Sequence, residues 1–394
     1  MKLGILTFHS SYNFGANLQA LAVQSAFQKH GVDVTVINFR EPAKEAMYQR
    51  MVAPEQASEH ENFFSTYLEI SPVMTSPDEV EAFCLEKLDC VVVGSDAVFR
   101  LVPKYEPRTL FERLIGRKTD SAFSTISDHV SPYFLNWQQH RNAKPKKASI
   151  AASAMGTLYQ FLKPNLYPQL YRAINDFDFI SVRDEWTRQM VSRLGLGRQH
   201  VEMCPDPVFS LNKNFNIPDP EMPSHELFNT ILLSGRFPKP WRKTFVDIAH
   251  AKGYRVGNLP NPENSYEFPE ADVAISLPLS PIAWYQLIAQ AAGFVGVRFH
   301  ALVSSVANRK PAISVDTPRK LSISIKRRNK IYDLWKRVGC PHRFYTMEQI
   351  SRTSAKQIMD VLFDENDLQR ETEYAERAKD TFTRVVQEIL TLVS

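Results

Sequence analysis

The stretch KLGILTFHSSYNFGANLQALAVQSAFQKHGVDVTVINF, residues 2–39, has the pattern of a strand, a helix and a second strand. An apolar run over residues 3–8 predicts a buried strand that leads into a polar loop. The helix predicted after this loop carries apolar residues on one face, and Gly31 is placed to end it. Residues 32–39 are β-branched and alternate, which predicts the second strand. This βαβ unit favours the α/β class.

The same alternation of strands and helices continues to the end of the chain. Further strands are predicted over residues 88–94, 148–153, 179–183, 201–204, 230–234, 273–277, 294–297 and 311–315. Helices are predicted over residues 184–194, 241–252, 282–291, 298–308 and 371–393. Two successive α/β segments closed by a terminal helix predict two Rossmann-like domains that face each other across a cleft.

Length and proline content suggest where the domains divide. A chain of 394 residues exceeds what one core usually organises. Prolines gather near residue 210, at positions 205, 207, 218, 220 and 223, as is typical of a linker. We therefore expect an N-terminal domain over residues 1–210 with an irregular insertion at about 99–147, a linker over 211–224, a C-terminal domain over 225–350, and C-terminal helices over 351–394.

Composition excludes several classes of protein. A net charge of +4 with 44% hydrophobic and 23% charged residues describes an ordinary globular chain, and no long basic run marks a nucleic-acid surface. The short basic clusters at 326–328 and 144–147 are interpreted as solvated loop charge. The four cysteines form no CxxC pair, so neither a zinc site nor a disulfide framework is expected. With no signal-peptide or membrane-spanning pattern, we expect the cytoplasm, and the terminal helix leaves open a peripheral contact with the inner face of a membrane.

Unusual polar residues follow two strands of the first half. Ligands bind beyond the carboxyl ends of parallel strands, so these positions are candidate sites. After the first strand, Asn13, Asn17 and Gln19 carry amides that suit sugar hydroxyls, next to a helix N-terminus; a simple capping turn is the alternative. After the strand at 88–94, Asp96 is a candidate acid, base or hydroxyl acceptor, with helix capping as its alternative.

Cationic residues follow three other strands. Arg183 ends an apolar strand and is either an anion ligand or a salt-bridge partner, while Asp184 is placed to cap the next helix. In the second half, Arg236 follows one strand, and Arg298 and His300 follow another just before a helix. An arginine can bind carboxylate or phosphate through two parallel hydrogen bonds, and histidine titrates near neutral pH. A histidine that only caps its own helix is the alternative.

Taken in order, these segments resemble the polysaccharide pyruvyltransferase family. The resemblance runs from GILTFH…NFGANLQALA (residues 4–22) through VGSD (93–96), FISVRDE (179–185) and Asp206-Pro207 to RFHALVSSVANRKP (298–311). It implies a two-domain arrangement like that of GT-B glycosyltransferases, usually without a metal. It also implies transfer of the pyruvyl group of phosphoenolpyruvate onto two hydroxyls of a sugar, as a ketal, with release of phosphate.

The resemblance assigns roles to the candidate residues. The C-terminal domain would bind phosphoenolpyruvate through Arg236, Arg298, Phe299 and His300, and we add Arg183 as a further ligand of the donor. His300 would act as general acid near the reacting carbon. On the acceptor side we rely on side-chain chemistry and not on the resemblance: Asp96 of the N-terminal domain could deprotonate a sugar hydroxyl, and Asn13, Asn17 and Gln19 could orient the sugar. No cofactor or metal is expected.

The expected partners are phosphoenolpyruvate and a saccharide or lipid-linked saccharide of a cell-surface polysaccharide, and no nucleic acid. Two other functions fit the same fold. A GT-B glycosyltransferase would use a nucleotide-sugar donor, for which no ribose-binding carboxylate is located. A carbohydrate-binding protein without activity would not require clustered cations. The sequence identifies neither the acceptor sugar nor the oligomeric state.

Overall fold

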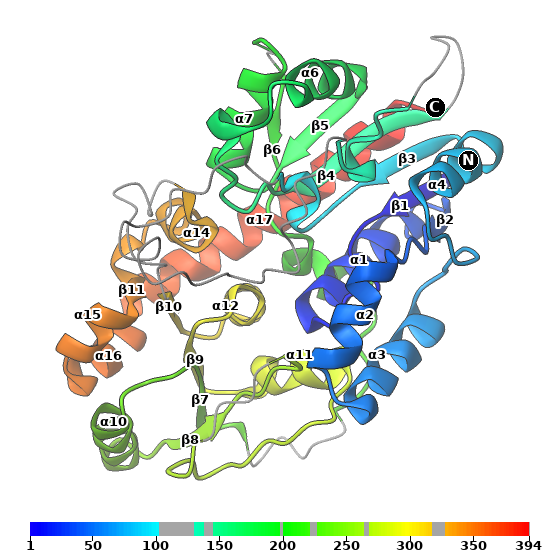
Figure 1. The fold of residues 1–394 in the computed structure, drawn as a ribbon. Helices are drawn as coiled ribbons and strands as arrows, with labels where there is room; N and C mark the ends of the chain where they lie inside the picture. The colour runs from blue at the N-terminus through cyan, green and yellow to red at the C-terminus, as the bar shows by residue number, and fades with distance from the viewer. Residues whose placement is uncertain are drawn as a thin grey trace, which may run out of the picture.

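The computed structural model describes residues 1–101, 130–137, 145–197, 200–220, 227–263, 268–316 and 328–393. Its strands form two all-parallel sheets, one in each half of the chain. Figure 1 shows the first sheet and its helices in the upper right, and the second sheet in the lower left. The predicted α/β class with two Rossmann-like domains is confirmed.

The first sheet has six strands in the order β2-β1-β3-β4-β5-β6. Its strands are β1 (Lys2–Leu6), β2 (Asp33–Val36), β3 (Cys90–Val93), β4 (Lys146–Ala152), β5 (Phe179–Val182) and β6 (Glu202–Met203). The helices of this half are α1 (Phe14–Gln28), α2 (Pro42–Met51), α3 (Pro54–Tyr67), α4 (Pro77–Lys87), α6 (Leu166–Asp176) and α7 (Glu185–Leu194), with short 3₁₀ turns η1 (Ala97–Phe99), η2 (Pro132–Phe134), η3 (Tyr159–Phe161) and η4 (Pro207–Ser210). The predicted βαβ start is confirmed, because β1 pairs in parallel with both β2 and β3. Most of the insertion expected at about 99–147 lies outside the described residues.

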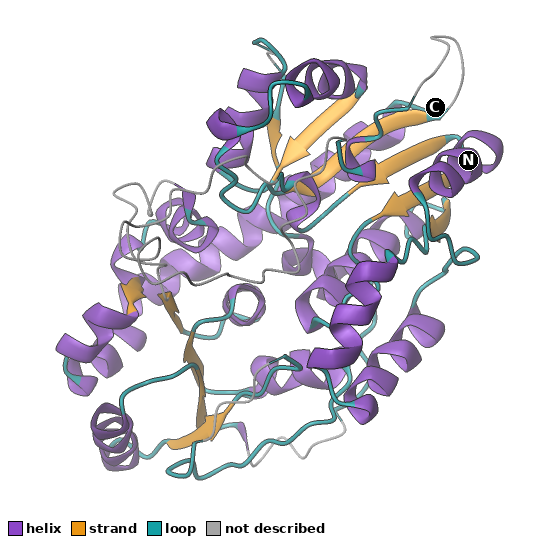
Figure 2. Ribbon diagram, viewed as in Figure 1, coloured by secondary structure: helices purple, strands orange, loops and turns teal. Residues whose placement is uncertain are grey.

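The second sheet has five strands in the order β11-β10-β9-β7-β8. Its strands are β7 (Thr230–Ser234), β8 (Arg255–Asn258), β9 (Gly293–Gly296), β10 (Ala312–Asp316) and β11 (Phe344–Thr346). The helices are α8 (Leu211–Asn214), α10 (Lys239–Ala251), α11 (Pro281–Gln290), α12 (Phe299–Ala307), α14 (Lys330–Val338), α15 (Met347–Arg352), α16 (Ala355–Leu362) and α17 (Glu365–Thr391), with the turn η5 (Pro341–Arg343). Figure 2 shows how the helices flank the two sheets.

The strand predicted over residues 273–277 is wrong. Only Val273 forms an isolated bridge, to Gly257, and the strand beside β7 is β8. After this bridge the chain leaves the sheet and reaches Pro278, which has no backbone N–H to donate to a neighbouring strand. The alternating apolar pattern therefore reflects partial burial of an irregular segment.

The terminal helix α17 connects the two halves. Its buried face packs against α1 and η4 of the first half and against α12 and α14 of the second. The helix thus covers parts of both domains. None of the helices in the described part of the chain is long and apolar enough to cross a bilayer.

Candidate functional site

The turn after β3 places an acidic residue at the carboxyl edge of the first sheet. Gly94 has φ +120°, and a Cβ at this position would lie 2.2 Å from the carbonyl oxygen of Ile150, so the turn requires glycine. Asp96 has φ +73°, a conformation that costs a non-glycine residue about 1–3 kcal/mol. Its backbone carbonyl accepts a hydrogen bond from the N–H of Ser153, which follows β4. This strained turn fixes Asp96 where strands β3 and β4 end.

A buried ion pair lies beside this turn. Arg183, which follows β5, is 1% exposed, and its NH1 donates to Asp206 Oδ2 at 2.8 Å. Gln19 Nε2 donates to the same oxygen at 2.6 Å. The second terminal nitrogen of Arg183, NH2, lies 3.6 Å from Asp96 Oδ1. One guanidinium therefore joins the ends of β3, β5 and β6, while Asp184 caps α7 through Thr187, as expected.

The second domain completes the cluster with residues at the starts of α12 and α14. Two cations contact the Phe299 ring, with the guanidinium carbon of Arg183 at 4.8 Å and Lys330 Nζ at 4.5 Å from its centroid. His300 Nε2 lies 3.8 Å from Asp206 Oδ2. We call Asp96, Arg183, Asp206, His300 and Lys330 the interdomain cluster, because neither domain forms it alone.

Gly15 sets the position of the imidazole. A Cβ on this residue would lie 2.0 Å from both Cγ and Nδ1 of His300, so the ring rests directly on the backbone of α1. Phe14, the preceding residue, stacks on Trp284 of the second half with ring centroids 5.2 Å apart. The side-chain amide of Gln56 in the first half and the backbone of Leu279 in the second also exchange two hydrogen bonds. These contacts hold the two domains together at the point where His300 enters.

Burial and neighbouring charges determine the protonation of the cluster. Burial lowers the pKa of His300 to about 4, so the imidazole is neutral at pH 7. Burial, and then the nearby charge of Arg183, lower the pKa of Lys330 to about 8. Burial alone would raise the pKa of Asp96, but Lys330, His300 and Arg183 outweigh it and the pKa lies below the ordinary value. The cluster therefore combines two carboxylates, Asp96 and the Asp206 that is paired with Arg183, with two cations and an uncharged imidazole.

Several polar atoms of the cluster have no hydrogen-bond partner among the described residues. They are Arg183 Nε and Nη2 and His300 Nε2, and the same holds for Oε1 of Gln19, the neighbour of Asp206. Buried polar groups are nearly always hydrogen bonded, and an exception calls for a ligand or water. Donors from a buried arginine favour an anionic ligand. In addition, α12 begins without a side-chain cap from its preceding residue, Arg298, which leaves its first backbone N–H groups to an external acceptor.

The other predicted donor ligands lie along the same edge of the second sheet. Arg236 follows β7 and is exposed, and Arg298 follows the neighbouring strand β9. The N–H of Val297 donates to the carbonyl of Ser234 at 2.9 Å, so the two loops leave the sheet side by side. Arg298 NH1 lies 3.5 Å from Glu263 Oε2. The three predicted residues Arg236, Arg298 and His300 thus lie along one edge of the sheet. The charged groups nearest to His300 are nevertheless those of the interdomain cluster, namely Asp96, Arg183, Asp206 and Lys330.

The amides predicted to bind the acceptor are engaged within the protein. Asn13 caps α1 by accepting from the N–H groups of Gly15 and Ala16. Asn17 donates to the carbonyls at positions 9 and 11 and accepts from His60. Both side chains shape the loop between β1 and α1, which agrees with the capping alternative, and contact with a sugar stays a prediction.

Sequence reasoning missed Asp206 and Lys330 as site residues. In the sequence, Asp206 belongs to the family pattern but lies within a proline-rich stretch that resembles a linker. Lys330 follows the basic cluster at 326–328, which was interpreted as solvated charge. The first two residues of this basic cluster, 326 and 327, lie outside the described residues. The third, Arg328, donates a hydrogen bond from Nη1 to the carbonyl of Gly156 in the first domain. Contact with the other domain, rather than solvent, explains a cation at this position.

Three solved structures have folds similar to that of this chain. A UDP-N-acetylglucosamine 2-epimerase of Methanocaldococcus jannaschii has a TM-score of 0.52 and 12% identity, with all of both chains covered. A protein described as the same kind of epimerase from Listeria monocytogenes has a TM-score of 0.52 and 10% identity, over 99% of this chain and 94% of that one. The spinosyn forosaminyltransferase SpnP has a TM-score of 0.50 and 11% identity, over 100% and 99%. At these identities the similarity establishes the GT-B-like fold alone.

The sequence also matches a family model. The model described as polysaccharide pyruvyl transferase matches residues 13–318, which include all of the candidate site residues named from the sequence. No curated protein matches the sequence closely enough to be counted as a relative.

Proposed function

Because the chain belongs to the polysaccharide pyruvyl transferase family, a family of pyruvyltransferase enzymes that act on saccharides, we propose that its donor is phosphoenolpyruvate and its product a pyruvyl ketal of a sugar. The observation that carries this proposal is the interdomain cluster. It presents two cations and unpaired buried donors to a small anion, next to an ionised carboxylate. A sugar-binding surface alone would not require this costly burial of charge.

Phosphoenolpyruvate carries a carboxylate and a phosphate, so it needs two anion-binding groups. Arg183, Lys330 and the first N–H groups of α12 would bind one of them, and Arg298 and Arg236 the other. The cluster is buried, so these interactions act in a low dielectric where they are stronger than in water. Binding would also give partners to the unpaired nitrogens of Arg183 and His300.

Ketal formation moves two protons. The methylene carbon of phosphoenolpyruvate takes up one proton, and the first sugar hydroxyl adds to the adjacent carbon. The carbon–oxygen bond to phosphate then breaks, and the second hydroxyl of the same sugar closes the ring. The two sugar hydroxyls together lose two protons. One of them makes up for the proton that the methylene carbon takes up as it becomes a methyl group, and the other leaves with phosphate.

Asp96 and His300 are placed for these proton transfers. Asp96 is ionised and 16% exposed, so it can accept a proton from a hydroxyl that reaches the cluster. His300 can carry a proton to the methylene carbon or the departing phosphate once the anionic donor is bound. Asp206 Oδ2, at 3.8 Å from His300 Nε2, lies beyond hydrogen-bond distance but close enough to stabilise the charge of the protonated ring.

One comparison of ligands distinguishes phosphoenolpyruvate from the alternative donor, a nucleotide sugar. Phosphoenolpyruvate should raise the melting temperature of the purified protein, whereas UDP- and ADP-sugars should not. Phosphate release from phosphoenolpyruvate is then assayed with galactosides, mannosides and glucosides as acceptors. A melting-temperature increase with a nucleotide sugar, together with none for phosphoenolpyruvate, would contradict the proposal.

A further inference from the structure

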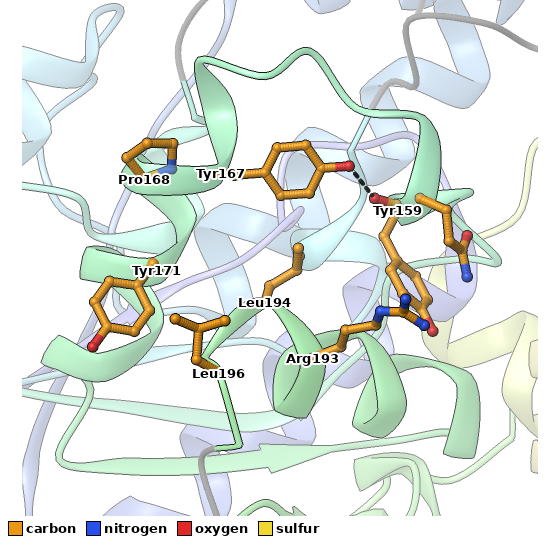
Figure 3. A pocket seen from close by; sticks show the side chains of 8 residues that line it. Tyr159, Tyr167, Pro168, Tyr171, Arg193, Leu194 and Leu196 are labelled. Carbon is orange, nitrogen blue, oxygen red and sulfur yellow. Dashed lines mark hydrogen bonds between the residues drawn. The ribbon is translucent and has the colours of Figure 1, made fainter.

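A cavity of about 550 Å³ opens on the outer face of the first domain, away from the interdomain cluster. Figure 3 shows Tyr167, Pro168 and Tyr171 on α6, facing Arg193 and Leu194 at the end of α7. A volume of this order accommodates a sugar or a small oligosaccharide. From its lining we infer that this cavity is a second saccharide-binding site, which holds an acidic sugar unit of the acceptor chain at a distance from the reacting sugar.

Two of the three tyrosine rings that line the cavity, those of Tyr159 and Tyr167, are held in place by contacts within the protein. The hydroxyl of Tyr167 donates to the carbonyl of Tyr159 at 3.2 Å (Figure 3). The Tyr159 ring packs on Trp186 at 5.2 Å, and the indole N–H of Trp186 donates to the carbonyl of Thr157. Tyrosine offers a rigid ring with a polar end at a low entropic cost. The C–H faces of a sugar pack on such rings while its hydroxyls bind polar groups at the rim.

Apolar side chains are exposed at the mouth of this cavity. Tyr171 is 43% exposed and Tyr167 36% exposed, although both are large rings. Leu196 is 79% exposed and has φ +51°, an uncommon and strained conformation for leucine. Water solvates such a surface poorly, so a ligand that covers it gains free energy.

Charge at the cavity selects an acidic ligand. Arg193 is exposed and lines the cavity with the amide of Gln160, and no lining residue, all of which lie in the described part of the chain, is acidic. A guanidinium without a carboxylate beside it can bind one from a ligand through two hydrogen bonds. Uronic acids and pyruvyl ketals both carry that carboxylate. A cavity lined by leucine and phenylalanine alone would instead favour a lipid chain.

Two segments connect this cavity to the interdomain cluster. Asp184 caps the N-terminus of α7 beside Arg183, and Arg193 lies in the last turn of the same helix. The ten residues of α7 span about 15 Å. The loop after β4 makes the same connection, since Ser153 bonds to Asp184 and Tyr159 lies six residues further on. An acceptor chain of several sugars can therefore reach both places.

The inference rests on the proposed saccharide acceptor but not on the donor, so direct binding tests it without phosphoenolpyruvate. Calorimetry would measure tetragalacturonate and, as the neutral probe, mannotetraose. We expect Tyr171→Ala to weaken tetragalacturonate binding by about tenfold or more, the scale of losing a central aromatic anchor. Arg193→Gln should weaken tetragalacturonate but not mannotetraose. The matched controls are Arg172→Gln, an exposed arginine of α6 outside the cavity, and Phe228→Ala, an exposed ring elsewhere.

Three outcomes would overturn the inference. They are no binding of either tetrasaccharide at millimolar concentration, binding that Tyr171→Ala leaves unchanged, and binding of phospholipid vesicles that depends on Tyr171 when the saccharides do not bind. Failure of the proposed function would look different. In that case wild-type protein releases no phosphate from phosphoenolpyruvate, whatever Tyr171→Ala does to saccharide binding.

Discussion

The contact between Gly15 and His300 makes Gly15→Ala a selective test of the site. The new Cβ would lie 2.0 Å from the imidazole, so the ring has to move by roughly 1.4 Å to reach an ordinary contact of 3.4 Å. Gly15 is the second residue of α1, where alanine favours the helix by up to roughly 0.5–1 kcal/mol relative to glycine and so offsets part of the cost of displacing the ring, roughly 1–3 kcal/mol. A misplacement of about 1 Å in an active site can cost about a hundredfold in rate. We therefore expect a melting temperature close to that of the wild type and a loss of about a hundredfold or more in kcat/KM.

Gly31→Ala is the matched control at the other end of α1. Gly31 has φ +73° and no atom within 4 Å of a Cβ built on it, so alanine there meets strain but no neighbour. That change should lower stability by roughly 1 kcal/mol and leave activity unchanged. The two variants should thus show opposite effects, measured by urea unfolding and by phosphate release from phosphoenolpyruvate. Wild-type kcat/KM in Gly15→Ala would refute the placement of His300 at the reacting centre.

Three further perturbations test other parts of the molecule. His300→Ala should lower kcat by about 10²–10⁴-fold without loss of folding, and near-normal turnover would remove its assignment. Since the pKa of Lys330 is about 8, its charge is present below pH 8 and lost above it; the affinity for phosphoenolpyruvate should fall between pH 7 and 9, and Lys330→Gln should remove this dependence. Arg343 is 0% exposed and its Nε donates to Asp367 at 2.9 Å, so Arg343→Met should cost roughly 3–5 kcal/mol in urea unfolding, whereas Arg309→Met, which breaks an exposed pair, should cost less than about 1 kcal/mol.

The parts of the site that could be predicted follow the ends of strands. Asp96 follows β3, Arg183 follows β5 and His300 follows β9, and parallel strands bring such residues to one edge of their sheet. Runs of apolar residues mark these strands clearly, so the sequence is sufficient to find their ends. The fold class was predictable for the same reason.

Lys330 could not be found this way because no predicted strand ends near it, and Asp206 follows the predicted strand over residues 201–204 but lies in a proline-rich stretch that resembles a linker. Lys330 begins α14, and Asp206 follows β6, which has two residues. Each acts across the domain interface: the charge of Lys330 lowers the pKa of Asp96 in the first domain, and Asp206 Oδ2 lies 3.8 Å from Nε2 of His300 in the second. Periodicity describes how one element packs on its own domain, and it does not encode how two domains face each other. The charge balance of the site therefore required the structure.

The low pKa of His300 in the free enzyme conflicts with a role as general acid, unless the bound donor raises it. With a pKa of about 4 the imidazole is uncharged at pH 7 in the free enzyme and has no proton to give as a cationic acid. Burial is the main cause, and Asp206 and Asp96 already oppose it. A bound phosphate and carboxylate add further negative charge within the same buried volume, which stabilises the imidazolium and raises its pKa. The substrate would thus supply the charge that makes His300 an acid.

This argument predicts that phosphoenolpyruvate binding takes up a proton at pH 7. Calorimetric titrations in buffers of different ionisation enthalpy measure that uptake, because the proton comes from the buffer. Lys330, with a pKa of about 8, is roughly one tenth deprotonated at pH 7 and contributes little. We expect clear uptake in the wild type and nearly none in His300→Gln. Binding enthalpies that do not depend on the buffer in the wild type would show that His300 stays neutral, and the acid would then have to be another group, with Lys330 the nearest candidate.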